Sequence, residues 1–287
     1  MTAPMAFVIA SDGAKLHAEI HEPPIRGSDR GPGIPLLLSC ALNTTHENWR
    51  PQVEAFTQAG VRVILWDYRG HGSSESPDDP DAYSMSQVVD DLGRVLDWAA
   101  PGEPAVLGGL SFGGLASLHF CLENPERVRA LVLIDSGPGF KKPEAQARWE
   151  AAVERTAQFI EAKGMGAFVA GRASLTAVGL RPDLPAARAA ARAIAAQNPA
   201  GLARFARGVA APACPVIDAL PSIRAPSLVV VGEKDEAYLR AAEVLAARLP
   251  EAERVTIPRA GHVVNIEEPD AFNAAVVRFL ARLTAAQ

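Results

Sequence analysis

The sequence predicts an α/β fold in which an eight-stranded, mostly parallel twisted sheet is flanked by helices and carries an inserted helical segment. Three observations predict this class. Short apolar strands alternate with helical patterns in the first half of the chain, the alternation returns near the carboxyl end, and the stretch between has no strand pattern. Such alternation is typical of β-α units, in which helices cover both faces of a parallel sheet.

Residues 1–137 contain the first six predicted strands. These strands are residues 7–9, 16–21, 36–39, 61–66, 105–107 and 128–134. Helices are expected between them at residues 51–58, 86–98 and 112–122. Only the turn Ser11, Asp12 and Gly13 separates the first two strands, so these two are expected to form an antiparallel hairpin.

Residues 223–287 complete the predicted core. They are expected to form a strand at 228–231, a helix at 237–248, a strand at 254–257 and a helix at 270–283. Residues 138–222 are predicted to be a helical cap, or lid, inserted between the two parts of the core. Its first segment, 145–160, has apolar side chains at helical spacing along one face, and further helical segments are expected at 165–170, 186–196 and 201–209.

A glycine-flanked serine follows the fifth strand. Gly109, Ser111 and Gly113 match the G-x-S-x-G pattern, with strand 105–107 before the turn and helix 112–122 after it. This context is that of a nucleophile elbow, in which a strained turn exposes a serine hydroxyl. Side chains at the two glycines would collide with the neighbouring strand and helix. The pattern predicts Ser111 as a catalytic nucleophile.

A serine hydroxyl needs a base to accept its proton, and His262 is the candidate among six histidines. It lies in a loop after strand 254–257, and open α/β sheets place their active sites at the carboxyl ends of strands. Other roles are expected for four of the remaining histidines. His17 and His21 are predicted to lie at the surface, and His71 to have a structural role in a turn. His119 is predicted to be packed or solvated on a helix.

The acid that orients the imidazole is expected at another strand end. Strand 228–231 leads into Gly232, Glu233, Lys234 and Asp235. Asp235 is the first choice, Glu233 the second, and Asp135, at the end of strand 128–134, the third. The order Ser111, Asp235, His262 is the order in which α/β-hydrolases carry their catalytic residues.

Three segments resemble that superfamily, and the similarity extends along nearly the whole chain. Residues 66–74 resemble its D-x-R-G-H-G-x-S turn, while residues 38–42 and 261–269 resemble 3-oxoadipate enol-lactonases and their carboxylesterase relatives. The resemblance implies a serine hydrolase that acts on the ester or lactone bond of a small molecule through an acyl-enzyme. The backbone N–H of Phe112 is expected in the oxyanion hole, and the resemblance implies Ala41 as the second donor.

Five side chains are predicted to contact substrate: Leu42, Trp149, Phe168, Arg172 and Val263. For Trp149 and Phe168, packing of the cap on the core is the alternative explanation. Arg172 follows the glycine-bounded segment 165–171, and its guanidinium group would match a substrate carboxylate. A solvated structural arginine is the alternative there.

Composition excludes several classes of function. A net charge of −5 argues against nucleic acid as a partner, and three widely spaced cysteines suggest neither a disulfide framework nor a metal site. We expect no metal, no organic cofactor and no membrane span. The start of the chain has no signal-peptide pattern, which predicts a cytoplasmic location. For the oligomeric state, the sequence is compatible with a monomer and with a homodimer.

Other chemistries share the expected residues. A hydrolase of C–C bonds, of the kind that acts on meta-cleavage products, and a cofactor-free perhydrolase would use the same three side chains. A ligand receptor built on the hydrolase fold is the alternative that is not an enzyme. Ser111 itself argues against haloalkane dehalogenases and epoxide hydrolases, which use an aspartate at the elbow.

Overall fold

The computed structural model describes residues 5–24 and 33–285, and its strands form one eight-stranded sheet with the order β1-β2-β4-β3-β5-β6-β7-β8. Residues 1–4, part of the segment searched for a signal peptide, lie outside the described residues. The strands are β1 (Met5–Ile9), β2 (Lys15–His21), β3 (Ile34–Ser39), β4 (Val61–Trp66), β5 (Ala105–Leu110), β6 (Val128–Ile134), β7 (Ser227–Gly232) and β8 (Ala252–Ile257).

The sheet is mostly parallel, as predicted. β1 and β2 form the expected antiparallel hairpin, and β2 also pairs antiparallel with β4. Every other neighbouring pair of strands is parallel. All positions of β4, β5 and β7 are buried, because these strands lie inside the sheet with helices on both of its faces.

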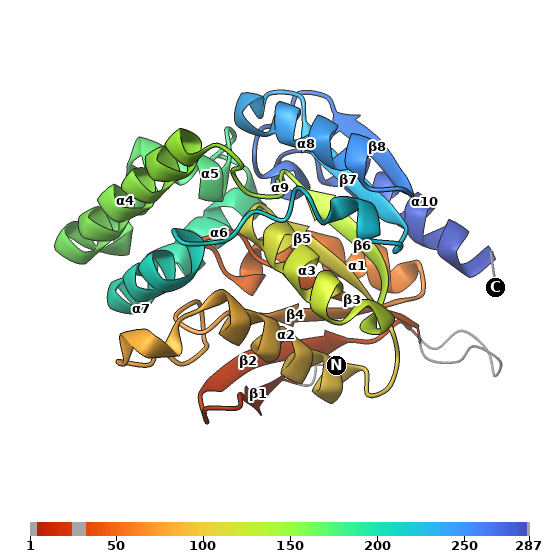
Figure 1. The fold of residues 1–287 in the computed structure, drawn as a ribbon, viewed down its shortest axis with the longest axis horizontal. Helices are drawn as coiled ribbons and strands as arrows, with labels where there is room; N and C mark the ends of the chain where they lie inside the picture. Colours follow the sequence, from red (N-terminus) through yellow and green to blue (C-terminus); the bar gives the residue numbers. More distant parts are fainter. Residues whose placement is uncertain (1–4, 25–32, 286–287) are drawn as a thin grey trace.

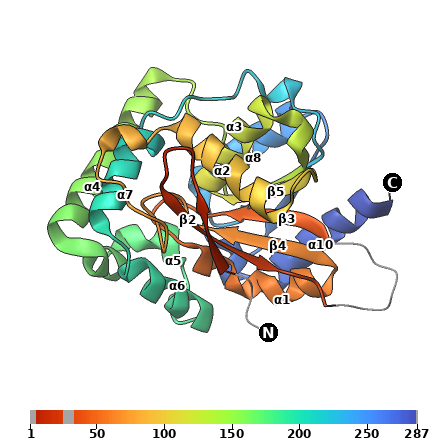
Figure 2. The same cartoon turned by 90° about the horizontal axis from the view of Figure 1, so that it is seen from below.

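Two layers of helices cover the sheet. α2, α3 and α8 lie on one face and α1 and α10 on the other (Figures 1 and 2). Their bounds are α1 (Arg50–Gln58), α2 (Met85–Ala99), α3 (Phe112–Glu123), α8 (Glu236–Arg248) and α10 (Pro269–Ala285). A short helix, α9 (Val264–Glu267), was not predicted. Within the described part of the chain, no helix has the length and apolar character that crossing a membrane requires.

The segment between β6 and β7 is helical and gathers at one end of the sheet (Figure 1). Its α-helices are α4 (Pro143–Ala170), α5 (Leu175–Val178), α6 (Pro185–Ala195) and α7 (Pro199–Phe205). The two segments predicted at 145–160 and 165–170 are joined in α4, which is interrupted at Gly164, where φ is +78°. Glycine adopts this backbone angle without the steric cost that other residues incur.

Two local expectations were wrong. β5 continues through Gly108 and Gly109 to Leu110, because both glycines pair with β6 in the sheet. His17 is only 2% exposed, although it was expected at the surface. β2 pairs with a strand on each side, and the imidazole ring of His46 packs on that of His17 with 4.5 Å between centroids.

Candidate active site

Ser111 lies at the sharp turn between β5 and α3. Its φ of +55° is in the left-handed region, a strained conformation for a residue with a side chain. The turn is held because Ser111 N–H donates to Ile134 O at 2.8 Å and Ser136 Oγ donates to Ser111 O at 2.7 Å. A Cβ atom at Gly109 would lie 2.1 Å from the carbonyl carbon of Gly113. The elbow therefore requires glycine at this position.

The start of α3 packs closely on the end of β3. A Cβ atom at Gly113 would lie 2.5 Å from Ser39 O and 2.8 Å from Cys40 O. Phe112 precedes Gly113 and Ala41 follows Cys40, so the two expected oxyanion donors lie on backbone segments that approach each other. Both residues are buried. This close approach is what a pair of backbone donors around one oxygen atom needs.

His262 and Asp235 form a direct hydrogen bond. The distance from His262 Nδ1 to Asp235 Oδ2 is 2.7 Å, and both side chains are buried. Asp235 comes directly before α8 and His262 lies in the loop after β8. The two loops are tied together because Lys234 N–H donates to Ala260 O at 2.8 Å. Asp235 can accept this hydrogen bond only from an Nδ1 atom that carries a proton. In a neutral imidazole with its proton on Nδ1, the lone pair is on Nε2.

The two alternative acids have other partners. Glu233 is exposed, and its Oε2 accepts the backbone N–H of Arg259 at 2.9 Å. Asp135 Oδ1 accepts the backbone N–H of Gly232 at 2.8 Å. Burial and the nearby Asp235 carboxylate raise the pKa of Asp135 well above its usual range. The Asp135 carboxyl group therefore holds the end of β7.

Tyr238 on α8 is a neighbour of the site that sequence reasoning missed. Its hydroxyl lies 3.5 Å from Ser111 Oγ, and its ring lies 4.7 Å from the His262 ring at an interplanar angle of 36°. Burial raises the pKa of Tyr238, so the phenol stays protonated. The only sequence signal is its position three residues after Asp235, which is one helical turn into α8.

We expect Tyr238→Phe to lower kcat for an aryl ester about 2- to 10-fold with little change in KM, since a neutral hydrogen bond contributes about 0.5–1.5 kcal/mol. We expect the phenol to position the serine hydroxyl, and the phenylalanine ring to keep the contact with His262. Tyr83→Phe is the matched control, because that hydroxyl donates to Pro77 O at 2.9 Å instead. Equal kcat values for the two variants would remove this role from Tyr238.

Glu267 was also missed, although it lies five residues after His262. Its buried carboxylate accepts two backbone N–H groups, that of Gly261 at 2.8 Å and that of Leu180 at 3.2 Å. Gly261 immediately precedes His262, and Leu180 belongs to the helical segment between β6 and β7. One side chain thus connects the histidine loop to this segment. Its place in residues 261–269, the segment that resembles the enol-lactonases, was the available signal.

The predicted substrate-contacting residues fall into two groups. Leu42 and Val263 directly follow Ala41 and His262, with Leu42 half-buried and Val263 buried. Phe168 is buried within α4, whereas Trp149 donates its indole N–H to Ala210 O at 2.8 Å. Arg172 is exposed after α4. Whether any of the five contacts substrate stays a prediction.

The helical segment reaches the elbow through Phe205, at the end of α7. The Phe205 ring centroid lies 5.3 Å from that of Phe112 and 4.5 Å from that of His71. Burial lowers the pKa of His71 to about 4, so this imidazole is neutral in its turn. The turn and α7 therefore pack as one aromatic cluster beside Ser111, in agreement with a structural role for His71.

Comparisons with known proteins agree with this architecture. A family model described as the alpha/beta hydrolase fold matches residues 34–269. A proposed carbamate hydrolase, RutD, from Rhizobium rhizogenes strain K84 is 31% identical over 277 residues, covering 92% of this chain and 97% of the relative.

Solved structures agree as well. An enol-lactonase from Burkholderia xenovorans LB400 has a TM-score of 0.76 and 27% identity, covering 97% of this chain and all of the other. A malate-bound thermophilic esterase from Thermogutta terrifontis has a TM-score of 0.80 and 25% identity, with 99% of both chains covered. The resemblance predicted from the motifs is confirmed, and with it the expectation of an enzyme of the hydrolase class. The chain belongs to the α/β-hydrolase fold family.

Proposed function

We propose that this protein is a serine hydrolase that cleaves the carboxylic ester or lactone bond of a small molecule through an acyl-enzyme. Ser111 is the nucleophile, His262 the general base and Asp235 the residue that orients the imidazole. The observation that carries this proposal is the 2.7 Å hydrogen bond between His262 Nδ1 and Asp235 Oδ2. Tyr238 connects this pair to Ser111 in its strained elbow, because its ring packs on that of His262 and its hydroxyl lies 3.5 Å from Ser111 Oγ. The enol-lactonase and esterase named among the similar structures support the substrate class.

The reaction proceeds in two halves. His262 Nε2 accepts the proton of the Ser111 hydroxyl as Oγ attacks the carbonyl carbon, and the backbone N–H groups of Phe112 and Ala41 stabilise the resulting oxyanion. The tetrahedral intermediate then expels the alkoxide, which takes the proton from His262. His262 then deprotonates a water molecule, which attacks the carbonyl carbon of the acyl-enzyme. As the acid leaves, His262 returns the proton to Ser111 Oγ. In a lactone the alcohol stays attached to the acyl group.

Residues 138–222 act in this proposal as a cap over the site, and residues 1–137 and 223–287 form the catalytic core. Two contacts support the division. Phe205 from the helical segment packs on Phe112, and Glu267 from the core accepts the N–H of Leu180 from that segment. A cap in this place would exclude water and complete the substrate pocket, as mobile lids do in many enzymes.

Carbamate hydrolysis is a second candidate function. The relative named as a proposed carbamate hydrolase is 31% identical over nearly the whole of both chains. A carbamate presents a carbonyl carbon to Ser111 Oγ as an ester does, and only the group retained on the serine differs. The same three side chains and the same oxyanion donors would therefore serve both reactions.

A panel of four substrates tests the proposal. Initial rates are measured with p-nitrophenyl acetate, an enol-lactone, an aryl carbamate and a vinylogous 1,5-diketone. We expect the highest kcat/KM for the ester or the lactone, and a burst of p-nitrophenol of one equivalent per active site if deacylation is the slower half. Preference for the carbamate would favour the second candidate. Turnover of the diketone alone would overturn the ester assignment, and binding without turnover of any compound would indicate a receptor.

A further inference from the structure

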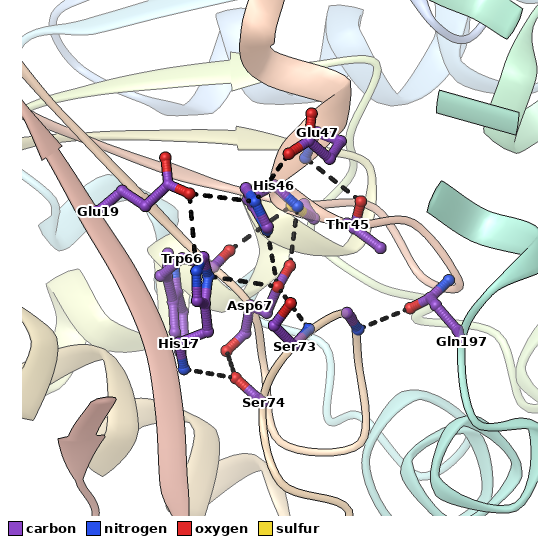
Figure 3. Close-up of polar contacts among 12 residues, drawn as sticks. His17, Glu19, Thr45, His46, Glu47, Trp66, Asp67, Ser73, Ser74 and Gln197 are labelled. Carbon is purple, nitrogen blue, oxygen red and sulfur yellow. Dashed lines mark hydrogen bonds and ion pairs between the residues drawn. The ribbon is translucent and has the colours of Figure 1, made fainter. Parts of the chain in front are cut away.

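A second group of buried ionisable side chains lies outside the proposed catalytic residues. His17 in β2, His46 at the start of a 3-10 turn (His46–Trp49) and Asp67 just after β4 come together although they are far apart in the sequence (Figure 3). All three are buried, and one potential ligand atom from each lies within 4.8 Å of the others.

The two imidazoles have the same orientation between two carboxylates. Each directs Nδ1 toward Asp67 Oδ2, at 3.6 Å for His17 and 2.7 Å for His46. Each directs Nε2 toward Glu19 Oε1, at 3.6 Å for His17 and 3.5 Å for His46. Figure 3 shows Glu19 on one side of the ring pair and Asp67 on the other. Glu47 Oε1 lies closer to His46 Nε2, at 3.1 Å. In metal sites a carboxylate commonly holds the N–H of a ligating histidine, which leaves the other nitrogen for the ion.

One atom in this cluster lacks a hydrogen bond. His17 Nδ1 is buried, points toward Asp67 and has no hydrogen-bond partner among the described residues. Buried polar atoms are nearly always paired, so such an atom calls for a physical explanation. A cation between the two Nδ1 atoms and Asp67 Oδ2 would satisfy it.

The charge around the cluster favours a cation. Glu19, Glu47 and Asp67 supply three carboxylates, and Arg50 forms ion pairs with Glu19 and with Glu47 at 2.8 Å. The three carboxylates and the Arg50 guanidinium group sum to −2, so an ion that replaces the proton held between His46 Nδ1 and Asp67 Oδ2 would meet a surplus of negative charge. The ligand atoms are two imidazole nitrogens and one carboxylate oxygen. This combination suits zinc and neighbouring first-row ions better than calcium or magnesium, which prefer oxygen ligands.

We propose that His17 Nδ1, His46 Nδ1 and Asp67 Oδ2 form a structural site for a divalent transition-metal ion of the zinc type. A tetrahedral ion with bonds of about 2.0–2.1 Å places its ligand atoms about 3.3 Å apart, a value between the two Nδ1–Oδ2 distances. Asp67 also accepts the backbone N–H groups of His46 at 2.8 Å and Ser73 at 2.9 Å. The ion would thus fasten β2, the His46 turn and the turn after β4 to one another, apart from the ester chemistry.

Metal titration of the whole protein tests the site. Protein stripped with a chelator is refolded with Co²⁺ or Zn²⁺, because a buried site fills slowly in the folded state. We expect one equivalent of Co²⁺ to remain after gel filtration, with the intense visible absorption of four-coordinate cobalt. Excess Zn²⁺ at about 100 times Kd should raise the Tm by about 5 °C or more. Less than a tenth of an equivalent retained, with no shift in Tm, would overturn the proposal.

The His17→Phe variant distinguishes two explanations of the cluster. One is a bound metal ion, and the other is a proton shared by His46 and Asp67. The substitution removes the unpaired nitrogen and keeps a planar ring, so we expect the Tm of chelated protein to stay within about 2 °C while cobalt binding and the zinc-dependent shift disappear. His119→Phe is the control, since this half-buried imidazole on α3 contacts Cys214 O. Should His17→Phe fail to fold, His17→Asn replaces it. Metal binding that survives at either His17 variant, or is lost in His119→Phe, would contradict the site.

Discussion

Ser111→Ala is expected to reduce kcat for p-nitrophenyl acetate by about 10⁶-fold while the protein stays folded, a loss known for single removals of a catalytic serine. Alanine and serine both have a Cβ atom, so the strained φ of +55° costs the two residues a similar free energy. The hydroxyl oxygen that attacks the carbonyl carbon is all that the substitution removes. Steady-state kinetics gives kcat, and thermal unfolding reports on the fold.

Ser117→Ala is the matched control for this variant. Ser117 lies on the same helix, α3, and its hydroxyl donates to Gly113 O at 2.8 Å. Its loss should lower stability by about 1 kcal/mol and leave kcat nearly unchanged. A folded Ser111→Ala protein with activity comparable to that of Ser117→Ala would refute the nucleophile assignment.

Asp235→Asn is expected to lower kcat by about 10⁴-fold, by analogy with the same change in other serine hydrolases. An asparagine amide facing His262 Nδ1 would donate to it and drive the proton to Nε2, where the base must have a lone pair. The geometry of the site would change little. Steady-state kinetics with p-nitrophenyl acetate measures kcat for this variant.

Asp135→Asn provides the internal comparison. Burial raises the pKa of Asp135 well above its usual range, which favours the uncharged form of this side chain. An amide keeps an oxygen that can accept the N–H of Gly232, so kcat should fall far less than in Asp235→Asn. The reverse ranking would transfer the orienting role to the end of β6 and leave the roles of Ser111 and His262 as proposed.

Most of the fold could be predicted because its signals are local. The apolar stretches that became β4 and β7 are continuous, as expected for strands covered on both faces, and each is followed by a turn and a helix. Residues 138–222 have no strand pattern anywhere along their length, which predicted a helical insertion. Its interruption at Gly164 was predicted as a gap between helices, because glycine weakens a helix wherever it occurs.

The candidate catalytic residues could also be proposed from the sequence, since each occupies the end of a strand. Asp235 could be ranked first among the acids, but the contacts of the candidate acids could not be predicted there. Asp135 and Asp235 both follow apolar strands, and only the structure shows that one contacts Gly232 and the other His262. The contacts of Tyr238 and Glu267 could not be predicted, because they depend on how α8 and the residues around α9 pack.

The sequence by itself determined the fold class, the elbow at Ser111 and the order of the three candidate residues, because glycine spacing, apolar runs and chain order are properties of short segments. The tertiary structure alone decided which side chains meet. His17, predicted at the surface, is buried against His46 and Asp67 because the pairing of β2 with β4 brings together residues from three separate segments. Strand order and side-chain direction arise from packing across the whole sheet, and no local pattern encodes them.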